Sequence, residues 1–222
     1  CKFCDMIFHL INRMNNKFFY LIKPYDICEE EKNIFFVHLP KCGGTTIDYI
    51  FLRFALSTKN FARSRLKDNI DNIDEVKNNI NKMNHKFFFT GHLNENFFDN
   101  LEKKPLKVTI IRNPIARIIS HYKFSSFRKG LDIKKYSLED FFNENYIKFE
   151  DNIVVRILSN TKNKDQIIGH KEVEIAMKNL EKFHLYSDFS EWEEFTRLLI
   201  SVCKFPNLLY AKFQKKNYPF NY

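Results

Sequence analysis

A lysine, two glycines and two threonines stand close together in the segment HLPKCGGTT, residues 38–46. The apolar run 33–39 predicts a buried strand and residues 45–56 predict a helix, so this segment is expected to be a strand-to-helix turn. Its glycines let the backbone approach a ligand, and the first N–H groups of the helix lie at the positive end of the helix dipole. We therefore predict an oxyanion site built from Lys41, Cys42, Gly43, Gly44, Thr45 and Thr46.

The position of the lysine distinguishes this turn from the usual nucleoside triphosphate loop. In that loop the pattern is GxxxxGK[ST], where the lysine follows the glycines and the hydroxyl binds magnesium. No such pattern occurs in the sequence, and Lys41 precedes both glycines. A magnesium-triphosphate ligand is therefore disfavoured. The simpler alternative is a tight turn in which the lysine is incidental.

A second candidate anion site lies in VTIIRNPIARIISHYKF, residues 108–124. Residues 107–114 predict a strand, and Pro114 favours the start of a helix. Arg112 lies at the carboxyl end of that strand, where open parallel sheets bind ligands, and Ser120 follows eight residues later on the helix. Together they are suited to hold a second phosphate, with bidentate contacts from the arginine. The alternative is that both are ordinary surface residues.

The remaining pattern predicts strands and helices in alternation. Further strands are expected over 86–92 and 183–188, and helices over 138–145, 151–159, 171–182 and 191–204. Strands that alternate with helices indicate a central parallel sheet flanked by helices, a three-layer α/β fold. We expect one domain over 1–222, with a core of about 33–205 and a peripheral amphipathic N-terminal segment, 1–32.

Two local patterns refine these boundaries. Ser137 with Asp140, and Ser190 with Glu193, have the spacing of helix capping boxes. The polar stretch 58–85 has apolar residues at helical spacing, which indicates a surface helix or excursion. Those apolar residues are Ile70, Ile73, Val76 and Ile80.

Composition limits the class of protein and its partners. The chain has 222 residues, 44% hydrophobic, including 25 phenylalanines, which suits one globular domain with a substantial core. Its net charge of +9 fits a nucleotide, an anionic polymer, a nucleic acid or a membrane surface, or simply solvated lysines. No zinc-finger, arginine-rich or RNP-type signature favours nucleic acid.

The cysteines, the apolar runs and the ends of the chain bear on disulfides, metals and membrane attachment. Five cysteines do not form a disulfide framework, and the lone CxxC of Cys1 and Cys4 is weak evidence for a metal. No run of about 18 apolar residues occurs, so no membrane span is predicted. Because the chain begins with Cys1 rather than Met, we expect a fragment, from which an upstream anchor or signal is missing. The basic, aromatic segment 211–222 is either a cover for a bound ligand or a mobile tail.

Taken together, the two anion-binding segments resemble those of the sulfotransferases that use PAPS (3′-phosphoadenosine 5′-phosphosulfate). HLPKCGGTT is similar to their loop for the 5′-phosphosulfate, although Thr is commoner at the position of Cys42. RNPIARIISHY is similar to their 3′-phosphate element, with Arg112 and Ser120 at the family spacing. The resemblance is closest to the carbohydrate branch, which includes heparan sulfate 2-O- and 6-O-sulfotransferases and bacterial relatives. It covers about residues 33–205 and implies a P-loop NTPase-like fold.

The resemblance also implies roles for individual residues. Lys41 would stabilise the negative charge that develops on the leaving phosphate as the S–O bond breaks. His92, which follows Gly91 at the end of a strand, would be the general base for the acceptor hydroxyl. Asn152 and Arg156, at spacing i, i+4, would line the acceptor or cofactor cleft; the alternative is an exposed polar helix face. The family needs no metal.

The function expected from these residues is a PAPS-dependent carbohydrate O-sulfotransferase, and an anionic polysaccharide acceptor fits the net charge. One alternative is a nucleotide-dependent phosphotransferase with a variant P-loop, disfavoured by the missing GK[ST] and by the lack of an obvious strand ending in Asp. Another is an inactive homologue that binds PAPS or glycans. We expect a cytoplasmic location for a bacterial protein, and the Golgi lumen for a eukaryotic fragment without its anchor. No nucleic acid partner is expected.

Overall fold

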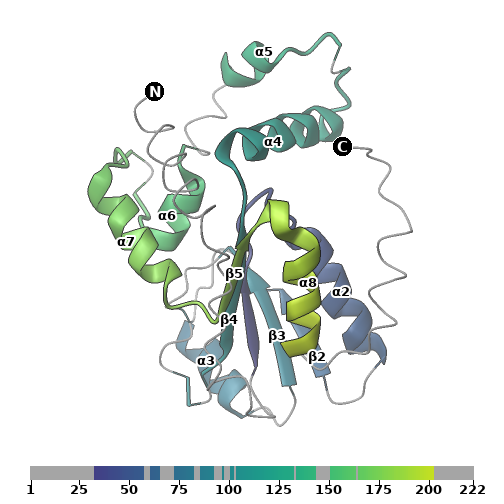
Figure 1. Cartoon of the computed structure of the whole chain (residues 1–222), viewed down its shortest axis with the longest axis vertical. Helices are drawn as coiled ribbons and strands as arrows, with labels where there is room; N and C mark the ends of the chain where they lie inside the picture. The colour runs from purple at the N-terminus through teal and green to yellow at the C-terminus, as the bar shows by residue number, and fades with distance from the viewer. Residues whose placement is uncertain are drawn as a thin grey trace.

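A five-stranded parallel sheet forms the centre of the protein, as the computed structural model shows (Figure 1). The structure describes residues 33–57, 61–65, 73–82, 86–92, 97, 101–102, 104–132, 134–143, 151–163 and 165–202. The strand order is β2-β3-β1-β4-β5, and every neighbouring pair is parallel. The strands are β1 (Ile34–Val37), β2 (Phe61–Arg65), β3 (Lys86–Gly91), β4 (Leu106–Ile111) and β5 (Leu185–Asp188).

Helices flank this sheet, which gives the expected α/β architecture. In Figure 1, α2 and α8 lie on the right of the sheet and α6 and α7 on the left, while α4 crosses above the carboxyl ends of the strands. The helices are α2 (Gly44–Ser57), α3 (Ile73–Asn81), α4 (Pro114–Arg128), α5 (Leu138–Asn143), α6 (Ile153–Ser159), α7 (His170–Leu180) and α8 (Trp192–Val202). A 3₁₀ turn, η3 (Phe189–Glu191), joins β5 to α8.

The inner strands are mainly apolar because both faces of the sheet are covered. Phe35, Phe36 and Val37 of β1 are fully buried, and the ring of Phe88 on β3 stacks on Phe51 of α2 with centroids 3.5 Å apart. Apolar runs of this kind are the signal that predicted β1, β3 and β4, while β5 was predicted from the segment 183–188 at the other edge. Those four, β1, β3, β4 and β5, are confirmed.

The fifth strand, β2, was not predicted. Its sequence, FARSR, lies within the polar stretch that was expected to be a surface helix or excursion, and it pairs only with β3 at the edge of the sheet. An edge strand needs less apolar sequence than a central one, which explains the missing signal. The helical part of the same stretch is confirmed by α3, in which Ile80 is buried.

The two capping predictions have different outcomes. The Ser137 amide donates to the Asp140 carboxylate at 2.8 Å and the Asp140 amide donates to the Ser137 hydroxyl at 3.0 Å, so that capping box is confirmed. The Ser190 cap is wrong. Ser190 lies inside η3, and its amide donates at 2.8 Å to the carboxylate of Asp188, which caps this turn from an earlier position.

Three predictions concern parts of the chain outside the described residues: the peripheral segment 1–32, the Cys1 and Cys4 pair within it, and the tail 211–222. Within the described part, no helix has both the length and the apolar character needed to cross a bilayer.

Candidate active site

The turn between β1 and α2, here called the glycine loop (residues 38–46), lies at the carboxyl edge of the sheet. Lys41 and Gly43 both have left-handed backbone dihedrals, with φ of 64° and 82°. The Cys42 amide donates to the Leu39 carbonyl at 3.2 Å and the Thr46 amide to the Gly43 carbonyl at 3.0 Å. The loop is therefore a compact turn that leads into the first amides of α2, at the positive end of the helix dipole. This arrangement favours an anion.

Both glycines of the loop are required by packing, and Gly43 is also required by its dihedral angle. A Cβ on Gly43 would lie 2.6 Å from the Trp192 ring and 2.7 Å from the Phe189 ring. A Cβ on Gly44 would lie within 2.7 Å of three ring atoms of His38. Neither position therefore accepts a larger side chain without displacing an aromatic neighbour.

Lys41 and Arg112 lie together at this loop. Arg112 Nη1 donates to the Lys41 carbonyl at 3.3 Å, and its guanidinium carbon lies 4.6 Å from the centre of the Phe189 ring. The Lys41 ammonium lies 3.7 Å from the centre of the Phe124 ring on α4. The structure thus brings the strand-end arginine to the loop lysine, as an anion site with two phosphates would require. Ser120 is buried on α4.

Arg117 is a further cation near the loop, and no role was predicted for it from the sequence. It is only 5% exposed, and it lies one turn before Ser120 on α4. Among nearby charges its guanidinium has the largest influence on the Cys42 thiol, ahead of Arg112 and Lys41. The available signal was its i, i+3 spacing to Ser120, which places both residues on one helix face.

Cys42 is part of the packing of the loop. The side chain is fully buried and its Sγ donates to the Pro40 carbonyl at 3.6 Å. Burial raises the pKa of the thiol to about 12, against the lowering effect of Arg117, Arg112 and Lys41 and with a raising effect from Asp188. The thiol is therefore neutral at physiological pH and is not a nucleophile.

His92 lies beside the glycine loop because β1 and β3 are neighbours. The His38 amide donates to the Gly91 carbonyl at 2.8 Å, and Nδ1 of His92 contacts the His38 carbonyl oxygen. A carbonyl oxygen only accepts hydrogen bonds, so Nδ1 of His92 carries the proton in this arrangement. The lone pair of Nε2 is then available to accept a proton from another group.

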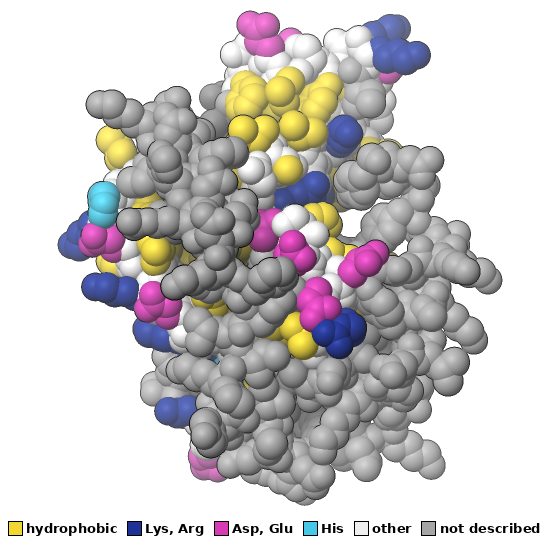
Figure 2. Space-filling model, viewed as in Figure 1, with side chains coloured by type: hydrophobic (Ala, Val, Ile, Leu, Met, Phe, Trp, Pro, Cys, Tyr) yellow, Lys and Arg dark blue, Asp and Glu magenta, His cyan; other side chains and the backbone are white. Residues whose placement is uncertain are grey.

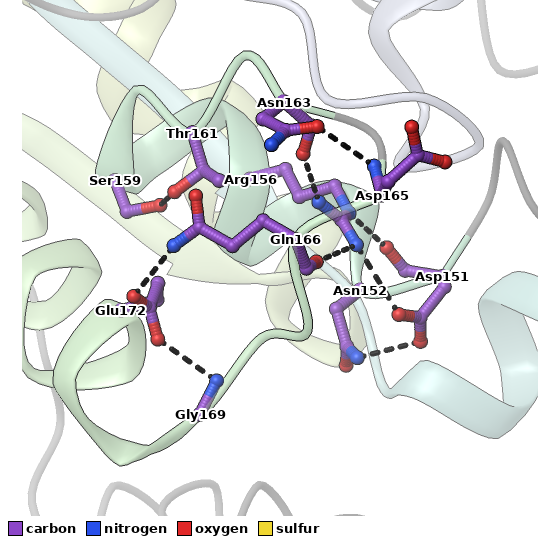
Figure 3. A network of polar contacts seen from close by, with 10 residues as sticks. All are labelled: Asp151, Asn152, Arg156, Ser159, Thr161, Asn163, Asp165, Gln166, Gly169 and Glu172. Carbon is purple, nitrogen blue, oxygen red and sulfur yellow. Dashed lines mark hydrogen bonds and ion pairs between the residues drawn. The ribbon is translucent and has the colours of Figure 1, made fainter.

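Arg156 has a different environment from the one predicted (Figure 3). Its side chain is buried, so the exposed polar face is wrong for this residue. Nε donates to the Asp151 carbonyl at 2.8 Å, Nη1 to the Asn163 carbonyl at 2.9 Å, and Nη2 to the Gln166 carbonyl at 2.8 Å. These bonds tie the start of α6 to the following loop, which leaves the guanidinium little capacity for an acceptor.

Asn152, the other predicted acceptor residue, precedes α6 with a left-handed backbone, φ 52°. Its side-chain amide donates to the Asp151 carboxylate at 2.6 Å (Figure 3). The structure thus places Asn152 and Arg156 in one polar network around Asp151. It does not join them to the glycine loop by any recorded contact among the described residues.

The expectation that no strand ends in Asp is wrong. Asp188 is the last residue of β5, at the same edge of the sheet as the glycine loop. One carboxylate oxygen accepts from the Ser190 amide, and the other is buried without a partner among the described residues. The strand predicted over 183–188 already ended at this residue, so the expectation disagreed with that strand assignment.

The comparisons with known proteins agree with this geometry. A family model described as the sulfotransferase family matches residues 24–208, which include the glycine loop, His92, Arg112 and Ser120. No curated protein gives a significant match. Because the match covers most of the chain and the parallel sheet places the loop where that fold requires it, this chain belongs to the sulfotransferase family.

Proposed function

We propose that this sulfotransferase moves the sulfuryl group from PAPS to a hydroxyl of a carbohydrate acceptor. The observation that carries the proposal is the position of Lys41, Arg112 and His92 around one glycine loop. The Arg112 guanidinium bonds to the Lys41 carbonyl, and the His92 imidazole bonds to the carbonyl of His38 in the same loop. Cations for the donor and a base for the acceptor are therefore within one small region.

The donor would be held at two points. The glycine loop, with the amides at the start of α2, the Lys41 ammonium and the hydroxyls of Thr45 and Thr46, is suited to the 5′-phosphosulfate. Arg112 and Ser120 are assigned to the 3′-phosphate, and a bidentate arginine contact suits that group. Arg117, buried beside them, adds positive charge from behind the loop.

The transfer would proceed by in-line displacement at sulfur. The acceptor oxygen forms a bond to sulfur while the bond from sulfur to the bridging phosphate oxygen breaks. His92 Nε2 takes the hydroxyl proton. A positioned general base increases the rate of such a reaction about 10²–10⁴-fold. The electron pair of the broken bond stays on the phosphate oxygen, where Lys41 stabilises it. The products are the sulfated acceptor and PAP (3′-phosphoadenosine 5′-phosphate).

The carbohydrate acceptor is supported by charge and by the surface next to the loop. The chain carries +9, which suits a glycan with acidic groups. Apolar side chains gather over α4 and α5 at the top of the molecule in Figure 2, and α4 carries the Phe124 ring beside which the Lys41 ammonium of the loop lies. The exposed apolar residues there are Ile115, Ile119, Phe124, Phe127, Leu131, Leu138 and Phe142.

Transfer of radioactive sulfate from labelled PAPS tests both halves of the proposal. The acceptors are a uronic acid polysaccharide, a neutral oligosaccharide, a simple phenol and a tyrosine peptide. Label on a saccharide, lost in Lys41→Ala and kept in the exposed-lysine control Lys123→Ala, is expected. Label only on phenol or peptide overturns the carbohydrate acceptor and leaves the donor assignment standing.

Asp188 is the feature that favours the alternative, a magnesium-dependent phosphotransferase, because carboxylates at strand ends are suited to magnesium. Against it, one oxygen of this carboxylate already caps η3. Phosphate transfer from labelled ATP with magnesium, under the same assay conditions, would replace the sulfuryl-transfer proposal.

A further inference from the structure

His38, the first residue of the glycine loop, lies between the loop and His92. The side chain is only 8% exposed. On one side its ring is so close to Gly44 that a Cβ there would lie within 2.7 Å of three ring atoms. On the other side the ring centre lies 4.6 Å from the ring centre of His92, with the two planes 36° apart.

The backbone of His38 contacts the same neighbours. Its amide donates to the Gly91 carbonyl at 2.8 Å, which fixes the end of β3 directly before His92. Its carbonyl accepts from Nδ1 of His92. One residue therefore determines both the tautomer of His92, through the carbonyl, and the plane of the imidazole, through the ring contact.

We propose that His38 is the positioning residue of the general base and that it couples donor binding to the orientation of that base. The inference rests on the proposed function of His92. A phosphosulfate in the glycine loop lies against the first residues of α2, which include Gly44. Because the His38 ring contacts both Gly44 and His92, ordering of the loop by the donor is transmitted to the imidazole.

The surroundings of His38 exclude the simpler possibility that it is itself the base. Its ring is enclosed by Gly44 and His92, and the Phe36 ring lies 6.0 Å away, centre to centre. A base must reach the acceptor hydroxyl at hydrogen-bond distance. His92 is more exposed than His38, so we assign the proton acceptor to His92 and infer that His38 acts through it.

Nitrogen-15 NMR of the histidine rings in the full chain tests the inference without turnover. The Nδ1–H tautomer is expected for His92, and its ring signals should shift when PAP is added. His38→Ala keeps the carbonyl but removes the ring, so PAP should still bind while the His92 shift is lost. His38→Phe keeps a flat ring in the same place and should restore the shift.

Kinetics give the second measurement. We expect kcat to fall on the order of 10- to 100-fold in His38→Ala, the range for a displaced catalytic group, with an unchanged KM for PAPS. His38→Phe should recover most of the loss. An Nε2–H tautomer, an unchanged kcat in a folded His38→Ala protein, or equal losses in both variants would overturn the inference. Absence of sulfuryl transfer in the unaltered protein would instead overturn the proposed function, and the NMR result would stand independently.

Discussion

The glycine loop and the Arg156 network use similar residues for different purposes. Both contain an arginine that donates to main-chain carbonyls and a residue with a left-handed backbone, Lys41 in one and Asn152 in the other. In the network, Arg156 donates to three carbonyls and contacts the Asp151 carboxylate at 3.4 Å. In the loop, Arg112 and Lys41 lie over aromatic rings at the carboxyl edge of the sheet.

Residue type and sequence spacing are therefore not sufficient to distinguish an arginine that binds a ligand from one that stabilises the fold. What distinguishes the two arginines is their place: Arg112 lies beside the glycine loop, whereas Arg156 ties the start of α6 to the following loop through three main-chain carbonyls. The comparison predicts opposite results for substitutions in the two regions: loss of chemistry with retained stability at the loop, and loss of stability with retained chemistry at the network.

The largest effect is expected for His92→Ala. Removal of the base should lower kcat about 10²–10⁴-fold, with little change in PAP affinity or thermal stability. His170→Ala is the matched control, because this histidine is exposed at the start of α7. Steady-state kinetics with labelled PAPS give the comparison, and a near-normal kcat in His92→Ala would show that another group accepts the proton.

Lys41→Ala should reduce kcat about 10²–10³-fold, since a donor to the developing oxyanion contributes this much. Lys123→Ala, an exposed lysine on α4, should leave kcat unchanged. A larger change in the KM for PAPS than in kcat would contradict the leaving-group role, because it would mean that the lysine contributes equally to ground state and transition state.

Arg156→Met is expected to lower stability and to keep activity, the opposite of the substitutions at the loop. Its loss deprives three carbonyls of a charged donor, and we expect the free energy of unfolding to fall by about 2–3 kcal/mol. PAP affinity and kcat of the folded protein should stay unchanged. Lys162→Met, an exposed residue of the same loop, is the control. Denaturant unfolding and steady-state kinetics on one preparation of Arg156→Met test this. Loss of activity without loss of stability would support the prediction that Arg156 lines the acceptor site.

The smallest effect on activity is expected at Cys42. Cys42→Ala should keep kcat within about twofold, because the thiol is neutral and serves packing. Its folded pKa of about 12 exceeds the ordinary value of 9.0, so the thiolate is favoured only in the unfolded chain. Its contribution to stability is therefore complete below pH 9 and declines as the pH rises from 9 toward 12.

Alkylation by iodoacetamide at pH 8, followed by peptide mass spectrometry, measures this directly. Cys42 should stay unmodified in the folded protein and react in the denatured one. Rapid modification of Cys42 in the folded protein would show that the loop opens to solvent.

Much of the fold followed from local sequence patterns. Apolar runs predicted the inner strands β1, β3 and β4 because inner parallel strands are buried on both faces, and the segment 183–188 predicted β5 at one edge. The edge strand β2 has no such run, and its pairing with β3 is a tertiary fact that FARSR does not encode locally. The start of α8 was misplaced because Asp188 and Ser190 both suit a cap, and only the backbone geometry decides between them.

The candidate site divides in the same way. Lys41, Gly43, Gly44 and Arg112 were predictable because a strand-to-helix turn and a strand end reach the same edge of a parallel sheet. The roles inferred for Arg117 and His38 were not, because they depend on burial and on contacts between elements far apart in the chain. The hydrogen bonds of Arg156 were not predictable for the same reason, since its carbonyl partners lie in a loop that the i, i+4 spacing does not describe.

The identity of the anion that the glycine loop binds is the central claim of the proposed function. Calorimetric titration of the protein with PAP, and separately with ATP and magnesium, measures this. We predict that PAP binds, that Arg112→Ala abolishes the binding, that the exposed Arg197→Ala leaves it intact, and that ATP gives no magnesium-dependent heat. Magnesium-dependent ATP binding without any response to PAP would contradict the account.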